Sequence, residues 1–340
     1  MTMTAPELTP ARDTTEVRLL EDFQRDLPLE PRPFAAIASK LGLAEASVIN
    51  RLEAMRQAGL IARVGGVVRP NTLGASTLAA MTVPALMFDD VADTLSGLAG
   101  INHIYMRENA LNLWFVVTGP DRDHVATTLA TIEKRTGFRV LDLRLERAYH
   151  IDLGFPLVDA SPLGRRTHRA DLYDTTFEFA SCDRALVQIL TDGLPIVSRP
   201  FAIVGETLGL HESEVIDRLK ALTTAGIVPR IGVIVRHRAL GWRSNAMVVW
   251  DVPSADVDAR GAALSQISGV NLCYRRTRYP RDWPYNLYCM VHARTRDEAC
   301  DTIVAASRAA GLDSAPRRIL FSLRCYKQTG ALVAHKEAHQ

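Results

Sequence analysis

The chain lacks the patterns that mark most cofactor-dependent and hydrolytic enzymes. Its 340 residues contain no G-x-G-x-x-G, G-x-x-x-x-G-K-[ST], H-E-x-x-H or G-x-S-x-G, so the best sequence signals for dinucleotide, nucleotide, zinc-protease and serine-hydrolase chemistry are missing. The five cysteines form no C-x-x-C pair and are odd in number, which argues against a zinc ribbon and against a complete disulfide set. We expect them to be reduced thiols in the core.

Long apolar runs and a strong charge of one sign are also missing. No stretch approaches the roughly 18 apolar residues of a membrane span, and the first residues lack the apolar core of a signal peptide, so we expect a cytoplasmic protein. The formal net charge is only +2, from 40 Lys and Arg against 38 Asp and Glu, which is weak support for duplex DNA as the main partner. A small anionic ligand needs only a local cluster of arginines.

The chain does contain an internal sequence repeat with two copies. The Arg-Pro-Phe segment at 32–34 recurs at 199–201, an offset of 167 residues (199 − 32). Such internal repetition indicates two copies of one supersecondary unit. The same offset relates Leu41-Gly42-Leu43 to Leu208-Gly209-Leu210 and Leu73-Gly74 to Leu240-Gly241, and after small insertions Tyr105 matches Tyr274 and Arg107 matches Arg276.

The first part of each copy reads as a winged helix-turn-helix. Apolar residues spaced by three and four predict two short helices joined by a turn through Gly42. Gly59 then ends the second helix, and a wing strand follows at 61–68. The apolar positions of the first copy are Phe34, Ile37, Ala38 and Leu41, then Val48, Leu52 and Met55.

The second part of each copy predicts a ferredoxin-like β-α-β-β-α-β unit. In the first copy, strands are expected near 76–83, 102–107, 112–118 and 140–145, with helices near 89–98 and 121–136. In the second copy, strands are expected near 245–250, 270–276, 286–292 and 317–323. The predicted domains are winged helix-turn-helix units at 15–70 and 181–237, ferredoxin-like units at 71–155 and 238–330, and a linker at 156–180.

The predicted fold class is therefore α+β, with two tandem repeats packed as a pseudo-dimer. This arrangement resembles the Lrp/AsnC regulators along nearly the whole of both copies. We expect each copy to present its sheet to the other, as separate Lrp-like subunits do when they dimerise.

The candidate recognition helices nevertheless argue against DNA binding. A helix in the major groove faces phosphates and normally carries Arg, Lys, Asn or Gln on its exposed face. The helix near 45–51 reads Glu-Ala-Ser-Val-Ile-Asn-Arg, and the one near 211–218 has three carboxylates. Carboxylates near a helix start suit the helix dipole but repel phosphate, so we interpret these helices as packing elements.

The densest unusual signal lies at 273–292. Arginines and aromatic residues alternate on two predicted strands and the loop between them, a pattern that suits a flat ring bearing carboxylates. Guanidinium groups would pair with the carboxylates, and aromatic rings would pack on the macrocycle. The stretch reads Cys273-Tyr274-Arg275-Arg276-Thr277-Arg278-Tyr279-Pro280-Arg281-Asp282-Trp283-Pro284-Tyr285-Asn286-Leu287 and ends at Val291-His292.

At these positions the chain resembles the siroheme decarboxylases, Lrp-like proteins of heme d1 biosynthesis, here as a single fused chain from roughly residue 15 to 330. The Trp-Pro-Tyr-Asn-Leu string followed by a histidine is fairly specific to that family. The residues carrying the resemblance are His103, Tyr105, Arg107 and Asn112-Leu113-Trp114 in the first copy, Tyr274, Arg276, Trp283 to Leu287 and His292 in the second, and Arg147-Ala148-Tyr149-His150.

The resemblance implies a carboxy-lyase that removes two acetate carboxyl groups of siroheme, giving 12,18-didecarboxysiroheme, without an added cofactor or a metal bound by protein alone. We expect His292 to donate the proton, since imidazole titrates near neutral pH, with Tyr274 as second choice. His292 or His103 could instead ligate the siroheme iron. We expect one pocket that binds the substrate through Arg276, Arg278, Arg281, Trp283, Tyr285, His103, Tyr105, Arg107 and His150.

Plainer interpretations stand beside these assignments. A strand histidine can be structural, arginines beside aromatic rings can be solvent-facing cation–π pairs, and Trp283-Pro284 can simply stiffen a hairpin. His150 with Tyr149 also suits packing or contacts between the copies. The alternative functions are a ligand-responsive Lrp/AsnC-type transcription regulator and a heme-binding scaffold without turnover. For the enzyme, the expected partners are the siroheme substrate, a second copy of the chain in a homodimer, and other enzymes of heme d1 biosynthesis.

Overall fold

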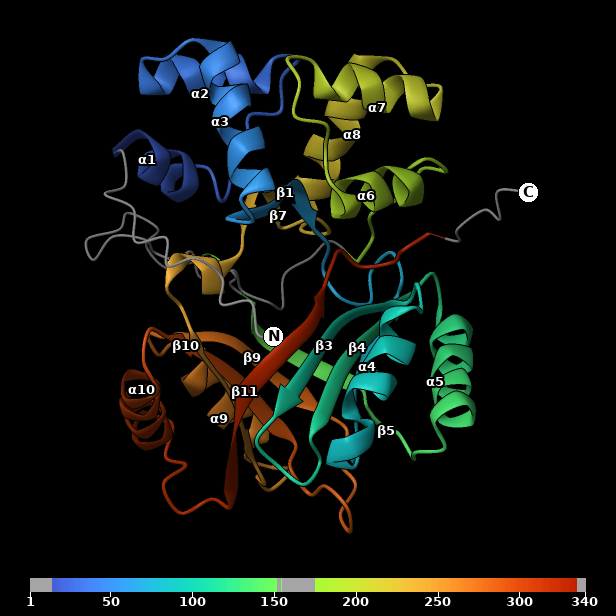
Figure 1. Ribbon diagram of the computed structural model, residues 1–340, viewed down its shortest axis with the longest axis vertical. Coiled ribbons are helices and arrows are strands. Elements are labelled where there is room, and N and C mark those ends of the chain that lie inside the picture. The colour runs from blue at the N-terminus through green and yellow to red at the C-terminus, as the bar shows by residue number, and fades with distance from the viewer. Residues whose placement is uncertain (1–13, 152–153, 155–174, 335–340) are drawn as a thin grey trace.

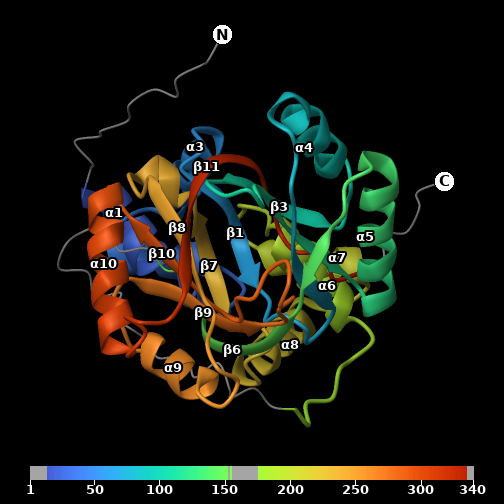
Figure 2. The same ribbon diagram turned by 90° about the horizontal axis from the view of Figure 1, so that it is seen from below.

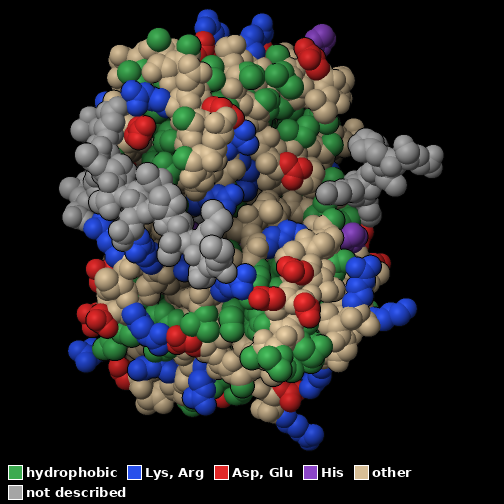
Figure 3. Space-filling model, viewed as in Figure 1, with side chains coloured by type: hydrophobic (Ala, Val, Ile, Leu, Met, Phe, Trp, Pro, Cys, Tyr) green, Lys and Arg blue, Asp and Glu red, His purple; other side chains and the backbone are tan. Residues whose placement is uncertain are grey.

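The computed structural model describes residues 14–151, 154 and 175–334, which form two layers (Figure 1). On the face seen in this view, Lys and Arg side chains are interspersed with Asp and Glu (Figure 3). The predicted linker at 156–180 lies mostly outside these residues. The upper layer holds both helix-turn-helix units, with a two-stranded sheet beneath them. Its elements are α1 (Thr14–Asp22), α2 (Pro33–Leu41), α3 (Glu45–Gln57), β1 (Ile61–Val67), α6 (Asp183–Asp192), α7 (Pro200–Leu208), α8 (Glu212–Thr224) and β7 (Arg230–Val235).

The helix-turn-helix units form where the apolar spacing predicts them. Helices α2 and α7 each begin with a proline, whose fixed φ suits the first helical turn. Each ends at a glycine in the left-handed region, Gly42 at φ 69° and Gly209 at φ 68°, a conformation that glycine adopts without strain. Phe34 and Phe201 are fully buried in one core shared by both units.

The two wings pair with each other. Strands β1 and β7 are antiparallel, with Gly65 opposite Gly232. A Cβ atom at Gly65 would lie 2.3 Å from the Leu190 carbonyl oxygen, and one at Gly232 would lie 2.5 Å from that of Gln24. Only glycine permits these close backbone approaches, and the result is one ribbon that ties both units together.

The lower layer contains the two β-α-β-β-α-β units, and the predicted fold class is confirmed. Each unit has the antiparallel strand order 4-1-3-2, counted within the unit. The first unit consists of β2 (Ala75–Met81), α4 (Phe88–Ser96), β3 (Ile101–Arg107), β4 (Leu113–Gly119), α5 (Arg122–Thr136) and β5 (Leu141–Leu143), and the second of β8 (Ser244–Trp250), α9 (Val257–Leu264), β9 (Val270–Arg276), β10 (Leu287–Ala293), α10 (Arg296–Ala309) and β11 (Arg317–Gln328). Short 3-10 turns are η1 (Ala85–Met87) and η2 (His237–Leu240).

The sequence predicts that each copy presents its own sheet to the other. The two units instead share one nine-stranded sheet, in the order β5-β2-β4-β3-β11-β8-β10-β9-β6. Strand β11 pairs with β8 through Arg317–Phe321 and then with β3 through Ser322–Gln328, and β6 (Leu145–Ile151) pairs with β9. The last strand of each copy therefore runs on past its predicted end. This exchange covers the edge strands β3 and β9, whose backbone groups would otherwise lack partners.

The shared sheet curls around a central space (Figure 2). Its end strands β5 and β6 are separated in the chain only by Arg144, so the two ends of the sheet lie close together. Helices α4, α5, α9 and α10 cover the outside. Side chains alternate between faces along each strand, and the inward ones form a cluster from both copies that includes Trp114, Met247, Tyr288 and Leu320.

None of the helices in the described ranges combines the length and apolar character that a bilayer crossing requires.

Candidate functional site

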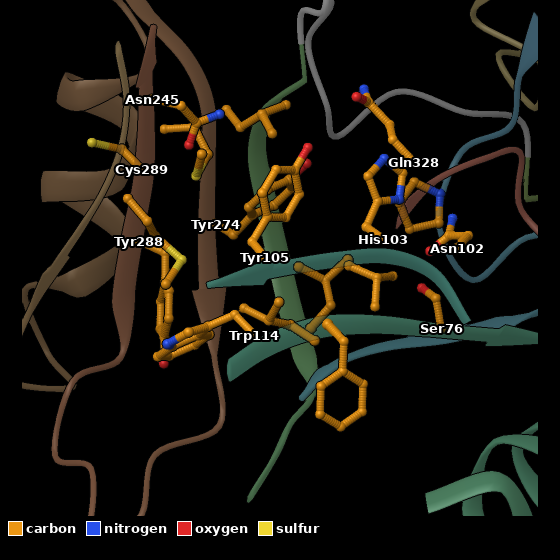
Figure 4. Close-up of a pocket in the computed structure, with 18 of the residues that line it drawn as sticks. Ser76, Asn102, His103, Tyr105, Trp114, Asn245, Tyr274, Tyr288, Cys289 and Gln328 are labelled. Atoms are coloured by element: carbon orange, nitrogen blue, oxygen red, sulfur yellow. The ribbon is translucent and has the colours of Figure 1, made fainter. Parts of the chain in front are cut away.

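A cavity of about 320 Å³ lies between the concave face of the sheet and the paired wings. This volume falls at the lower end of the range for small-molecule sites, about 300–1,000 Å³. Figure 4 shows Tyr105 and Tyr274 near its centre, with His103 on one side and Asn245 on the other. The wings contribute Val67, Pro70, Arg230, Ile234, Val235 and His237, and the sheet contributes, among others, Tyr105, Arg107, Trp114, Asn245, Tyr274, Arg276, Tyr288 and His292.

The duplication brings two Tyr-x-Arg pairs into one cavity. Because alternate strand residues face the same way, Tyr105 and Arg107 of β3 and Tyr274 and Arg276 of β9 all point inward. Each guanidinium lies over the tyrosine ring of its own pair, at 5.3 Å in the first copy and 5.0 Å in the second. Burial raises the pKa of Tyr105, and burial raises that of Tyr274 to about 12, so both phenols keep their protons at neutral pH.

Two of the arginines that line the cavity, Arg107 and Arg276, have no carboxylate partner among the described residues. Arg107 donates to Leu320 O at 3.0 Å and to Asn245 Oδ1 at 3.3 Å, and Arg276 donates to Leu143 O at 3.0 Å. Neither forms an ion pair, and neither Nε has a hydrogen-bond partner, within the ranges that the structure describes. Burial lowers the pKa of Arg107 to about 10 and also lowers that of Arg276. Among the carboxylates of the described chain, only the more distant Asp142 acts on Arg276, and none acts on Arg107. Buried cations without a direct ion pair are unfavourable, so the cavity suits an anionic ligand.

His292 is held by two asparagines. Its Nδ1 lies 3.0 Å from Asn271 Oδ1, and its Nε2 lies 2.7 Å from Asn245 Nδ2. Asn245 Oδ1 accepts from Arg107 and Ser322, which directs its Nδ2 toward the ring. This network assigns a neutral imidazole that donates from Nδ1 and accepts at Nε2. Burial, with the charges of His237 and Arg107, holds the pKa of His292 well below its usual range.

His103 has a different environment on the opposite side. Its ring stacks on Tyr105, with centroids 6.3 Å apart, and its buried Nδ1 has no hydrogen-bond partner among the described residues. Burial, with the charges of Arg63 and His237, lowers the pKa of His103 to about 4. A neutral imidazole with an unused nitrogen can ligate an iron ion that a ligand brings with it.

The buried histidines predict an acid-sensitive fold. Burial lowers the pKa of His237 to about 4, and that of His292 lies well below 6.5; unfolded histidine has a pKa of about 6.5. The unfolded chain therefore binds more protons below pH 6.5, so stability falls as the pH drops from about 6.5 toward 4, by about 1.4 kcal/mol per pH unit for each such histidine. Urea unfolding at several pH values measures this slope, and His237→Gln should flatten it. An unchanged slope in that variant would contradict the assignment.

Five residues predicted to bind a ligand do not line this cavity. Arg278 pairs with Asp251 at 2.8 Å, Arg281 is exposed, and His150 is buried in β6. Trp283 and Tyr285 are buried behind the cavity wall, where Trp283 packs on Trp114 at 5.2 Å and donates from Nε1 to Tyr288 Oη at 2.8 Å. The hollow is therefore formed by strands and wings, and the hairpin supports it from behind.

Sequence reasoning missed the wing residues and the asparagines. His237 begins η2, two residues after the end of β7, and its ring lies 4.9 Å from that of His292. Asn245 occupies an inward position of β8. A polar residue at an inward position of an otherwise apolar strand, as in Ser244–Trp250, is the signal that could have indicated Asn245.

Comparisons with known families agree with the duplication. The model described as Siroheme decarboxylase NirDL-like HTH domain matches residues 16–61 and 183–228, and the one described as AsnC-like ligand binding domain matches 72–150 and 239–327. The siroheme decarboxylase NirDL subunit of Paracoccus denitrificans is 49% identical over 96% of this chain and 99% of its own length. The NirD subunit of Pseudomonas aeruginosa is 44% identical over 43% of this chain and 97% of its own length, so it corresponds to one copy.

Two solved structures share the fold. A crystal structure of the siroheme decarboxylase NirDL superposes with a TM-score of 0.65 and 24% identity, over 94% of each chain. A second, described as NirDL in co-complex with an iron-uroporphyrin III analogue, gives a TM-score of 0.64 over 93% of each chain, also at 24% identity.

Proposed function

Since this chain belongs to the siroheme decarboxylase NirDL family, we propose that it is a carboxy-lyase that converts siroheme to 12,18-didecarboxysiroheme in heme d1 biosynthesis. The observation that carries the proposal is the pair of buried arginines, Arg107 and Arg276, which face one cavity without carboxylate partners in the described part of the chain. They suit a ring with carboxylate side chains. The rings of Tyr105 and Tyr274, near the centre of the cavity (Figure 4), suit its flat faces.

Each decarboxylation consumes one proton. The bond between the acetate methylene and its carboxylate breaks, carbon dioxide leaves, and a proton replaces it, so that the acetate becomes a methyl group. Protonation of the macrocycle beside the acetate lets the ring accept the electron pair of this bond. A proton then adds to the methylene carbon and the ring proton is released, so the net uptake is one proton per carboxyl group. No organic cofactor is needed for that step, and the protein has to supply the proton and hold the other carboxylates.

His292 is the proposed proton donor. The protein groups around His292 favour the neutral ring, but bound carboxylates would raise its pKa by the attraction of opposite charges. The donor would therefore become charged only when substrate is present. Tyr274 is the second candidate, because its buried phenol stays protonated and lies at the centre of the cavity.

His103 is the proposed axial ligand of the siroheme iron. Its Nδ1 is unused among the described residues, whereas both ring nitrogens of His292 already face asparagine side chains. His103 would thus bind the iron, and His292 would donate the proton from the other side of Tyr105 and Tyr274.

The regulator alternative is weakened by the helix-turn-helix units themselves. Arg32 is ion-paired with Glu45 at the start of α3, and its counterpart Arg199 with Glu212 at the start of α8. Both arginines are thus neutralised at the helix ends that would approach phosphate.

The proposal predicts that the purified protein, without added cofactor, removes two carbon dioxide molecules from siroheme under anaerobic conditions. Mass spectrometry of the extracted tetrapyrrole measures the loss, and protoheme, which has no acetate side chains, is the control. Spectral binding with unchanged mass would indicate a scaffold. Binding to a duplex with steep salt dependence, again without mass loss, would favour the regulator.

A further inference from the structure

A second cavity extends the site beneath the wings. It has a volume of about 230 Å³ and shares eight lining residues with the first, among them Asn102, His103 and Gln328. Its further lining comes from β1, from the segment that follows β1, and from the last described residues of the chain. A ring seated beside His103 would therefore direct part of its edge into this extension.

Arg63 of β1 lines the extension and is poorly satisfied there. Among the described residues its buried Nε has no hydrogen-bond partner, and its hydrogen bond from Nη2 to Gly66 O is long, at 3.5 Å. Its charge is close enough to His103 to lower the pKa of that imidazole. Arg63 is thus a cation next to the proposed iron ligand.

The positive charge of Arg63 is only partly balanced by nearby negative charge. Burial lowers the pKa of Arg63, and only the charge of Asp192 acts in the opposite direction. Asp192 nevertheless forms no ion pair with Arg63 within the described ranges, although Arg63 also borders the outer groove in which Asp192 lies. A half-buried guanidinium in this state would gain from a carboxylate delivered by a ligand.

The duplication supports a role for this position. Arg63 and Arg230 are related by the same 167-residue offset as the helix-turn-helix units, and Arg230 lines the first cavity from the opposite wing. Arg230 is already fixed by backbone carbonyls, donating to Gln24 O at 2.7 Å and to Val233 O at 3.3 Å. Within the part of the chain that the structure describes, Arg63 has no comparably short hydrogen bond.

We propose that Arg63 binds a peripheral carboxylate of the tetrapyrrole, which makes the wing of the first helix-turn-helix unit a specificity-determining part of the substrate site. The inference rests on the proposed function, because it takes its ligand to be a carboxylate-bearing ring. It also gives the helix-turn-helix units a role in an enzyme: the wings carry substrate contacts in place of DNA contacts.

The test is a spectroscopic titration of the whole protein with iron-uroporphyrin III, which has many carboxylates, and with protoheme, which has few. We expect Arg63→Gln to weaken iron-uroporphyrin binding about tenfold to a hundredfold, the effect of losing a hydrogen bond between charged groups. Arg63→Lys should recover part of the affinity, and protoheme binding should change little. The matched control is Arg56→Gln, an exposed arginine of the same unit that pairs with Glu53.

Several outcomes would overturn the inference. Unchanged iron-uroporphyrin affinity in Arg63→Gln does so, as does an equal loss for both rings, which would indicate a structural role. Asp192→Asn tests whether the role of Arg63 is only to interact with Asp192. We expect this variant to bind iron-uroporphyrin III as tightly as wild type or more tightly, and a loss of affinity like that of Arg63→Gln would contradict the inference. A wild-type protein that binds neither ring overturns the proposed function as well, whereas wild-type binding with an unaffected Arg63→Gln overturns this inference alone.

Discussion

His292→Ala is expected to lower the rate of siroheme decarboxylation by about two to four orders of magnitude, the usual contribution of a positioned general acid. The residue lies at the cavity wall with Asn245 and Asn271 fixing its ring, and each lost carboxyl group requires a proton. Single-turnover kinetics with extracted product measures the effect. Binding of the ring should be reduced far less than the rate.

The matched control is His150→Gln. His150 lies in β6, next to the strand that carries Tyr274, but does not line the cavity. We expect near wild-type rates from this variant, provided that thermal melting shows it folded. A second measurement separates a donor from a packing residue: calorimetry at pH 7 should detect about one proton taken up when wild-type protein binds substrate, and none in His292→Ala. Equal rates in His292→Ala and wild type would exclude the donor role.

Arg276→Gln and Arg278→Gln are expected to differ strongly, although the two residues are neighbours in the alternating arginine pattern. Arg276 faces the cavity and has no ion pair in the described ranges, while Arg278 is bound to Asp251 outside it. Loss of a charge-assisted contact in Arg276→Gln should weaken siroheme binding about tenfold to a hundredfold. Arg278→Gln removes a half-exposed ion pair and should leave affinity within about twofold.

Equilibrium titration under anaerobic conditions measures both affinities. Arg107→Gln is the symmetric companion, because Arg107 occupies the equivalent place in β3, and it should resemble Arg276→Gln. If Arg278→Gln weakened siroheme binding as much as Arg276→Gln, the hairpin would contact the substrate directly. The binding site would then extend beyond the cavity beneath the wings.

Much of this architecture could be predicted from local patterns in the sequence. The 167-residue repeat and the three-and-four spacing of apolar residues predict both helix-turn-helix units, because helix formation and capping depend on neighbours in the chain. Strand alternation also places Tyr105 with Arg107, and Tyr274 with Arg276, on shared faces. These four residues line the cavity.

The features that the sequence did not reveal depend on contacts between distant segments. The exchange of β6 and β11 joins each copy to the edge strand of the other, and nothing in a strand's own residues specifies which edge it will meet. The hairpin at 278–285 was expected to surround the ligand. Trp283 instead packs on Trp114 of the other copy, and Tyr285 packs on Trp283, which the local alternation of arginine and aromatic side chains could not indicate.

The chemistry of the histidines is equally non-local. Asn245 lies 47 residues from His292 in the chain, and Asn271 lies 21 residues away, so the tautomer and the lowered pKa of His292 follow only from the folded arrangement. The wings were expected only as parts of the helix-turn-helix units. They line one side of the cavity because β1 and β7 pair with each other.

The central claim is that the tetrapyrrole reacts in the hollow between the paired wings and the curled sheet. A crystal structure of this protein with iron-uroporphyrin III tests it most directly. We expect the ring against Tyr105 and Tyr274, its iron at His103, and its carboxylates on Arg107, Arg276 and Arg63. A ring bound at the hairpin around Arg281, or on the outer surface of the helix-turn-helix units, would contradict the account.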